Sequence, residues 1–236
     1  MSMRESTRHY DLLQAFAEPR CPICAMVLRD LKKDMDTLLL ERINKVPTHL
    51  AFRAGRGLCN GHAHRLIQAK GGALGIAVMY ESTMVELMKD VSKAANSSGG
   101  GFLRGGSAGT KAADTLEPTG ACLMCEAMTK NENFYVSIVA ENVRDSELQP
   151  AFADSTGGVC LPHGRLVLRQ LSSKDDVKAF MALQQPKWAE LQAHLQKYIE
   201  QNDNNVPQHK MGIERDSWSR AIRYLSGDDG VFGYRR

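Results

Sequence analysis

Hydrophobic residues recur at intervals of three and four positions in two long stretches of the chain. In the first stretch they are Leu28, Leu31, Met35, Leu38, Leu39 and Ile43. In the second they are Phe134, Tyr135, Ile138, Val139 and Val143. This spacing is typical of an amphipathic helix that packs one face against a core. Pro47 and Pro150 follow the two stretches and predict that each helix ends before its proline.

Further helices are predicted after each of two later motifs that contain histidine. We expect helices that carry His62 and His163 in their first turns. The first could continue to Val91, although the glycines at 71, 72 and 75 favour a break. The chain beyond His163 predicts a helix over 177–183 and a separate one that begins at Pro186, because proline suits the first turn of a helix.

The last periodic stretch runs from Glu214 to Leu225. Trp218, Ile222 and Leu225 share one helical face. Together with Arg215, Arg220 and Arg223 they could form a docking surface, but we expect this face to cap the core. No stretch alternates as a strand would, so the predicted fold is mostly α.

All six cysteines belong to short motifs with the spacing of metal ligands. Two CxxC motifs hold Cys21 with Cys24 and Cys122 with Cys125, and two CxxH motifs hold Cys59 with His62 and Cys160 with His163. In both halves of the chain 34 residues separate the CxxC from the CxxH, and the second set lies 101 residues after the first. This equality indicates an internal repeat.

Two such pairs complete a tetrahedral set of three sulfurs and one imidazole. We expect one site in each repeat, formed by Cys21, Cys24, Cys59 and His62 in the first and by Cys122, Cys125, Cys160 and His163 in the second. His64 could replace His62, but Arg165 occupies the matching place in the second repeat, which favours His62. A thioredoxin-like dithiol would leave the CxxH motifs unexplained.

The donor set is that of structural zinc, so two zinc ions are expected. Three thiolates leave each zinc site about one negative charge, which helix N-termini and nearby arginines would offset. The candidate arginines are Arg20, Arg53, Arg56 and Arg165. Iron–sulfur clusters remain an alternative, because three cysteines and one histidine can also hold a cluster and the spacing does not separate the two.

The repeat and the composition between its halves predict the domain organisation. Residues 1–95 and 122–203 are expected to form related helical hairpins, each tied by its own Cys3His site. The Gly- and Ser-rich stretch 96–121 is expected to be a linker or loop, and residues 204–236 a C-terminal helix and tail.

Composition narrows the classes of function. The net charge of +3 and the pI near 8.5 are below what a dedicated nucleic-acid binder carries. No stretch of 18 apolar residues and no signal-peptide core is present, so we expect a cytoplasmic protein without a membrane partner. In that reducing compartment cysteines serve as metal ligands or redox groups more often than as structural disulfides.

The motifs resemble an uncharacterised prokaryotic family. CPxC at the start of a helix, an interval of some thirty residues, a CxxH preceded by glycine and a late helix with tryptophan are similar to a family of unknown function with paired CxxC and CxxH motifs. Leu123 stands where the first motif has Pro22. The resemblance implies the metal sites and no activity.

Three functions fit these observations. The leading hypothesis is a non-enzymatic, metal-stabilised adaptor or assembly protein with another protein as partner, because no HExxH, GxSxG or dinucleotide-binding motif is present. The second is an electron-transfer or redox-sensing protein with iron–sulfur clusters. Nucleic-acid binding ranks third, since classical zinc fingers leave only about 12 residues between their Cys and His pairs.

Overall fold

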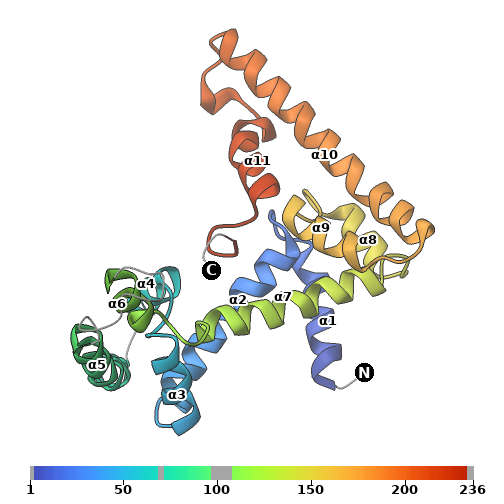
Figure 1. Ribbon diagram of the computed structural model, residues 1–236. Coiled ribbons are helices and arrows are strands. Elements are labelled where there is room, and N and C mark those ends of the chain that lie inside the picture. The colour runs from blue at the N-terminus through green and yellow to red at the C-terminus, as the bar shows by residue number, and fades with distance from the viewer. Residues whose placement is uncertain (1–2, 69–71, 97–107, 233–236) are drawn as a thin grey trace. The chain divides into compact units, whose positions relative to one another are not determined.

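The computed structural model describes residues 3–68, 72–96 and 108–232, and these residues are folded into helices and loops without a strand (Figure 1). The predicted mostly α fold is confirmed. None of the described helices is both long and apolar enough to cross a membrane.

The chain divides into two compact units. Unit 1 joins the residues up to Asp30 with those from Thr129 onward, and unit 2 spans Leu31–Met128. Two helices contribute to both units: α2 (Pro22–Thr37) and α7 (Leu123–Glu141). The units therefore divide the chain differently from the ranges expected from the repeat.

Unit 1 contains the beginning of α2 and most of α7. Its other elements are α1 (Met3–Ala15), α8 (Leu148–Asp154), α9 (Leu161–Gln170), α10 (Lys174–Asp203), the short 3-10 helices η2 (Gln208–Lys210) and η3 (Ile213–Asp216), and α11 (Ser217–Ser226).

Three phenylalanines lie at the centre of unit 1. The ring of Phe152 on α8 lies 5.2 Å from that of Phe16 and 6.1 Å from that of Phe180 on α10, measured between centroids. All three side chains are buried. Burial of each large apolar side chain contributes roughly 1.5–3 kcal/mol, so these rings connect the chain after α1 with α8 and α10.

A buried polar cluster lies beside this core. Asp30 near the middle of α2 accepts hydrogen bonds from Arg8 at 2.8 Å and from the hydroxyl of Tyr135 at 2.6 Å. Arg8 also donates to the Tyr135 hydroxyl, and its guanidinium lies 4.1 Å from the ring centroid of Phe134. Burial and the contact with Asp30 raise the pKa of Tyr135 to about 12, so the hydroxyl stays a donor.

Unit 2 contains the end of α2 and the start of α7. Its other elements are the π-helical turn η1 (Leu38–Arg42), α3 (Val46–Ala54), α4 (Asn60–Ile67), α5 (Ala73–Asn96) and α6 (Ala108–Leu116). Phe52 on α3 packs edge-on against Tyr80 on α5, with centroids 5.0 Å apart, and joins these two helices.

Most predicted helix limits agree with the structure. The first two helices end before Pro47 and Pro150, which both lie in the first turn of the next helix. Helices α4 and α5 are separate, and the glycine at 71 of the expected break lies outside the described residues. Part of the expected linker is helical, since α6 covers residues 108–116, whereas residues 97–107 lie outside the description.

The prediction of two helices divided at Pro186 is wrong, because α10 is continuous over 30 residues with this proline inside it. An internal proline costs about 3 kcal/mol through the lost hydrogen bond and a clash with the preceding turn. Phe180 and Gln184, just upstream, are fully buried. Their tertiary contacts offset the local cost.

The prediction that the apolar face of the last helix caps the core is also wrong. Helix α11 buries Ser217, Arg220 and Tyr224 and leaves Trp218 and Ile222 more than half exposed, at 53% and 58%. The neighbouring Leu225 is 62% exposed. Polar partners account for the orientation, because Arg220 donates to the carbonyl of Ile213 at 2.7 Å and approaches His194 on α10.

Candidate metal centres

The eight predicted ligands gather into two quartets. Site A consists of Cys21, Cys24, Cys160 and His163, and site B of Cys59, His62, Cys122 and Cys125. Within each site the donor atoms all lie within 4.8 Å of one another. Site A belongs to unit 1 and site B to unit 2.

Distances within site A are short and even. The Nδ1 atom of His163 lies 3.5 Å from the sulfur of Cys21, 3.4 Å from that of Cys24 and 3.3 Å from that of Cys160. The sulfurs of Cys24 and Cys160 are 3.8 Å apart.

Site B has nearly the same dimensions. The Nδ1 atom of His62 lies 3.2 Å from the sulfur of Cys59, 3.6 Å from that of Cys122 and 3.4 Å from that of Cys125. The sulfurs of Cys59 and Cys125 are 3.6 Å apart. The structure thus identifies His62, and not His64, as the member of the quartet.

The expected pairing of motifs within each repeat is wrong. Cys21 and Cys24 meet Cys160 and His163, while Cys122 and Cys125 meet Cys59 and His62. The two sites are therefore nested in the sequence, with site B formed by the inner pair of motifs and site A by the outer pair. Each repeat supplies half of both sites.

The outgoing and returning helices of each repeat differ in length. The helices after the two CxxC motifs have 16 and 19 residues, so they carry the chain roughly 24 and 28 Å away at 1.5 Å per residue. The helices that precede the CxxH motifs, α3 and α8, have nine and seven residues, about 10–14 Å. The helical part of the return path is thus shorter than the outgoing helix, and in the structure each CxxH meets the CxxC of the other repeat.

Each quartet lies at the N-termini of two helices. Helices α2 and α9 begin beside site A, and α4 and α7 begin beside site B. Cys160 and Cys59 are the N-cap residues of α9 and α4, and their carbonyls accept the first helical hydrogen bonds. The positive ends of these helix dipoles stabilise thiolates.

A glycine in the left-handed region precedes each CxxH by the same distance. Gly57 has φ +94° and Gly158 has φ +66°, conformations that residues with a side chain rarely adopt. A β-carbon on Gly158 would lie 2.6 Å from the ring of Phe152, and one on Gly57 would lie 3.0 Å from the ring of Tyr80. Both glycines let the loop turn sharply into the helix that carries the histidine of the CxxH motif.

Site A has a buried carboxylate behind its histidine. The Nε2 atom of His163 lies 3.1 Å from Oε1 of Glu132 on α7, and both side chains are buried. A carboxylate on the far nitrogen fixes the orientation of a metal-binding imidazole and increases its basicity. At site B the corresponding nitrogen of His62 lies 2.9 Å from the sulfur of Met128, which carries no charge.

The loop that delivers Cys160 is also held by α10. The side chain of Gln184 accepts from the backbone N–H of Val159 at 2.9 Å and donates to the carbonyl of Gly157 at 3.2 Å. Sequence reasoning identified neither Gln184 nor Glu132. A signal for Glu132 existed, because it shares with Met128, Tyr135 and Val139 a stripe of helical spacing that is otherwise apolar.

The C-terminal segment covers site A. The ring of Phe232 lies 4.9 Å from that of His163, and a β-carbon on Gly227 would lie 3.8 Å from the sulfur of Cys24. Arg20, next to the first ligand, binds Asp228 of this segment at 2.7 Å. Site A is consequently closed to solvent.

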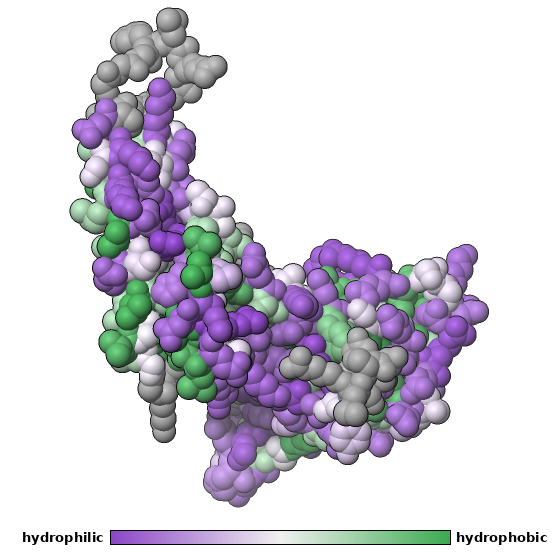
Figure 2. Space-filling model, turned by 90° about the horizontal axis from the view of Figure 1, so that it is seen from below, coloured by the Kyte–Doolittle hydropathy of each residue, from purple (hydrophilic) through white to green (hydrophobic). Residues whose placement is uncertain are grey.

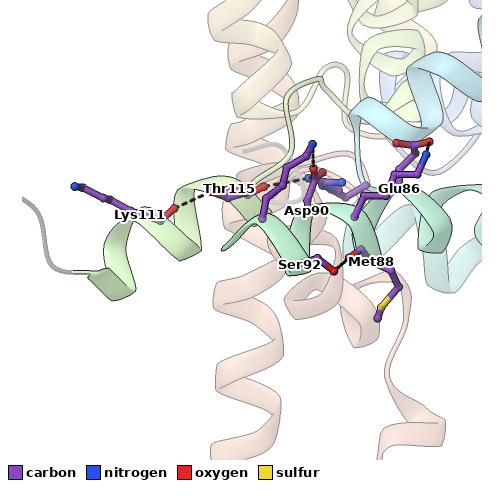
Figure 3. Close-up of polar contacts among 9 residues, drawn as sticks. Glu86, Met88, Asp90, Ser92, Lys111 and Thr115 are labelled. Atoms are coloured by element: carbon purple, nitrogen blue, oxygen red, sulfur yellow. Dashed lines mark hydrogen bonds and ion pairs between the residues drawn. The ribbon is translucent and has the colours of Figure 1, made fainter. Parts of the chain in front are cut away.

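Helices α5 and α6 hold the loop that delivers Cys59 to site B. Arg56 binds Asp90 on α5 at 2.6 Å and donates to the carbonyl of Thr115 on α6 at 3.2 Å. Figure 3 shows Asp90 and Thr115 on these two neighbouring helices. Hydrogen bonds from Arg56 and Lys93 lower the pKa of Asp90, so the carboxylate remains charged.

The thiols of each quartet differ in acidity. Burial raises the pKa of Cys21, but hydrogen bonds with Cys160, Cys24 and His163 outweigh it and the pKa lies well below the ordinary value. Hydrogen bonds with Cys160 and Cys21 raise the pKa of Cys24. In site B burial and the negative charge of Cys122 raise the pKa of Cys125. A divalent cation would supply the charge that lets all three thiols ionise.

The four arginines expected to offset the charge of the sites lie in different surroundings. Arg20 and Arg56 are engaged by Asp228 and Asp90, and Arg53 lies 3.9 Å from Glu86. Arg165 is exposed. The N-termini of helices supply positive charge at both sites.

The fold and the two sites define a mostly helical protein with two Cys3His groups. The chain belongs to a family of unknown function, DUF6062, whose model matches residues 3–230. It is also similar to an uncharacterised 23.9 kDa protein in the xynA 3′ region of Caldicellulosiruptor sp. (strain Rt8B.4), with 23% identity over 226 residues that cover 92% of this chain and 99% of that protein. No solved structure matches.

The nested pairing predicts which cysteines lose protection together. Replacing Cys24 by Ser should make Cys160 more reactive toward an alkylating reagent in metal-loaded protein and leave Cys59 unchanged, because Cys160 shares the site of Cys24 and Cys59 does not. Differential alkylation followed by mass spectrometry measures this. Cys125→Ser is the matched control and should expose Cys59 instead. If Cys59 became more reactive in Cys24→Ser and Cys160 became more reactive in Cys125→Ser, the motifs would instead pair within each repeat.

The carboxylate behind His163 predicts a difference in metal affinity between variants. Glu132→Gln should weaken metal binding at site A by about 10–100-fold, as loss of such an outer partner does elsewhere. Met128→Leu should change the affinity of site B little, because the thioether carries no charge. Competition with a chromogenic chelator measures both affinities. Unchanged affinity in Glu132→Gln would show that the carboxylate does not orient the ligand.

Proposed function

We propose that the protein binds two structural zinc ions, one in site A and one in site B. Zn–S distances of about 2.3 Å and Zn–N distances of about 2.0–2.1 Å give a tetrahedron whose edges are about 3.8 Å between sulfurs and about 3.5 Å between sulfur and nitrogen. One sulfur–sulfur edge in each site measures 3.8 or 3.6 Å, the sulfur–nitrogen edges measure 3.2–3.6 Å, and all donor atoms lie within 4.8 Å of one another. This agreement is the observation that carries the proposal.

The same dimensions argue against an iron–sulfur cluster. In a cluster the ligands bind different irons, so their donor atoms are farther apart than around a single ion. Donors within 4.8 Å of one another suit one ion. Four protein ligands also fill the coordination sphere of zinc, which supports a structural and not a hydrolytic role.

The zinc ions would stabilise a scaffold that binds another protein. Helix α11 supports this proposal, since Trp218, Ile222 and Leu225 occur at the i, i+4, i+7 spacing of helices that dock into apolar grooves. Figure 2 shows that the apolar areas on one face of the molecule are separated by hydrophilic ones. Helix α11 differs from an ordinary amphipathic surface helix, because its inner face is polar and its outer face is apolar.

The charges near α11 indicate the chemistry of the partner. Arg215 and Arg223 are exposed, and among the described residues neither forms an ion pair. A groove bordered by carboxylates would match them. Residues 204–232 carry four Lys or Arg and four Asp or Glu, so they lack the excess positive charge that favours an anionic membrane. We place this activity in the cytoplasm, where thiols remain reduced.

Metal analysis tests the zinc proposal. Protein purified without added metal should contain two zinc ions per chain and be colourless, and removal of zinc by a strong chelator should abolish most of its helical circular dichroism. Elemental analysis and the visible spectrum are the measurements. Stoichiometric iron with visible absorption, or a metal-free chain that stays folded, would overturn the proposal.

Photo-crosslinking tests the docking face of α11. A photoreactive residue at position 222 should crosslink to a partner in cells, while the same residue at position 199 should not. Ile199 on α10 is a matched control, because its exposure of 57% is nearly that of Ile222 but it does not belong to the apolar face of α11. The crosslinked protein, once identified and purified, should bind Leu225→Asp at least about tenfold more weakly than the unaltered chain. Equal crosslinking from both positions would refute a specific surface.

A further inference from the structure

The two quartets differ in the exposure of their sulfurs. In site A the cysteines are buried, with exposed fractions of 2% for Cys21 and 0% for Cys24 and Cys160. In site B all three cysteines are partly exposed, although the imidazole of His62 is buried. Oxidants reach thiolates in proportion to their exposure, so the two sites should differ in chemical stability.

The covering elements account for this difference. Site A lies beneath the C-terminal segment, where Phe232 contacts His163 and Gly227 lies against Cys24. At site B a neighbour is the half-buried Tyr80 of α5, which packs on Gly57. The covering of site B thus leaves its thiols in contact with solvent.

We propose that site B is a site of reversible oxidation, at which peroxide converts Cys59 and Cys125 to a disulfide and the zinc ion is released. This inference rests on the proposed function, because it assumes that both sites hold zinc. The pair is chosen by geometry: the two sulfurs are 3.6 Å apart and belong to segments 66 residues apart, at the N-termini of α4 and α7.

The reaction balances with hydrogen peroxide as the oxidant. One thiolate attacks a peroxide oxygen, so that an S–O bond forms, the O–O bond breaks, and hydroxide leaves and takes up a proton. The second thiolate then attacks the sulfenic sulfur, forming the S–S bond and releasing a second water after protonation. Two thiolates lose two electrons in total, and one peroxide with two protons becomes two waters.

Oxidation removes two of the four donors of site B. Cys122 and His62 remain, and two donors do not complete the tetrahedral site that structural zinc requires. The disulfide still joins α4 to α7, so unit 2 keeps a covalent tie between these segments. A thiol reductant together with zinc should restore the original site.

Limited oxidation of the two-zinc protein tests the proposal. With hydrogen peroxide as the probe, one zinc equivalent should be released at least about tenfold faster than the other, measured with a chromogenic chelator. Peptide mapping under non-reducing conditions should find Cys59 joined to Cys125 while Cys21, Cys24 and Cys160 stay reduced. Treatment with dithiothreitol and zinc should return the protein to two ions per chain.

Variants separate the two sites in the same assay. Cys24→Ser should retain one zinc ion that peroxide releases rapidly, and Cys125→Ser should retain one that resists it. The mapping on the unaltered chain requires no variant, so a folding failure in either variant leaves the test intact. Release of both ions at one rate, earlier oxidation of site A, or a failure to reverse would overturn the proposal.

The control before oxidation distinguishes this inference from the proposed function. If the purified protein does not contain two zinc ions, the proposed function fails, and the inference about release of zinc from site B fails with it. If it contains two ions and both resist peroxide equally, the zinc proposal stands and the selective oxidation of site B is refuted.

Discussion

The geometry of four donors around a common centre constrains this molecule more than any other feature. Three sulfurs and one imidazole nitrogen must lie within a few ångströms of each other, yet they come from segments 60–66 residues apart in site B and 136–142 apart in site A. Closing such long loops costs conformational entropy that helical packing must offset. Each site therefore lies where two helices begin.

The nested order of the motifs links local structure to the two units. Outer motifs form site A in unit 1, and inner motifs form site B in unit 2. Helix α2 begins at the CxxC of site A in unit 1 and continues into unit 2. Helix α7 begins at the CxxC of site B in unit 2 and continues into unit 1. Loss of one motif should thus affect a site in its own unit while the other quartet remains complete.

The surroundings make two chemically similar quartets unequal. Site A has Glu132 behind its histidine, Gln184 on its loop and the C-terminal segment above it. Site B has the neutral Met128 behind its histidine and partly exposed sulfurs. Burial and a fixed imidazole suit a permanent structural ion, whereas exposure suits an ion that can leave. Helix α11, whose apolar face is exposed, packs against α9 of site A and adds an apolar surface there.

The sequence alone determined the eight residues of the two Cys3His groups, the helical fold and most helix limits, because these depend on short spacings and local periodicity. It did not determine which CxxC meets which CxxH, since equal intervals of 34 residues are compatible with more than one pairing. The tertiary structure decided that, by bringing each CxxC to the CxxH of the other repeat. Tertiary contacts also decided the course of α10 through Pro186, where Phe180 and Gln184 are buried, and the orientation of α11, where Arg220 donates a hydrogen bond to the carbonyl of Ile213. Such contacts outweigh the local preferences on which sequence patterns depend.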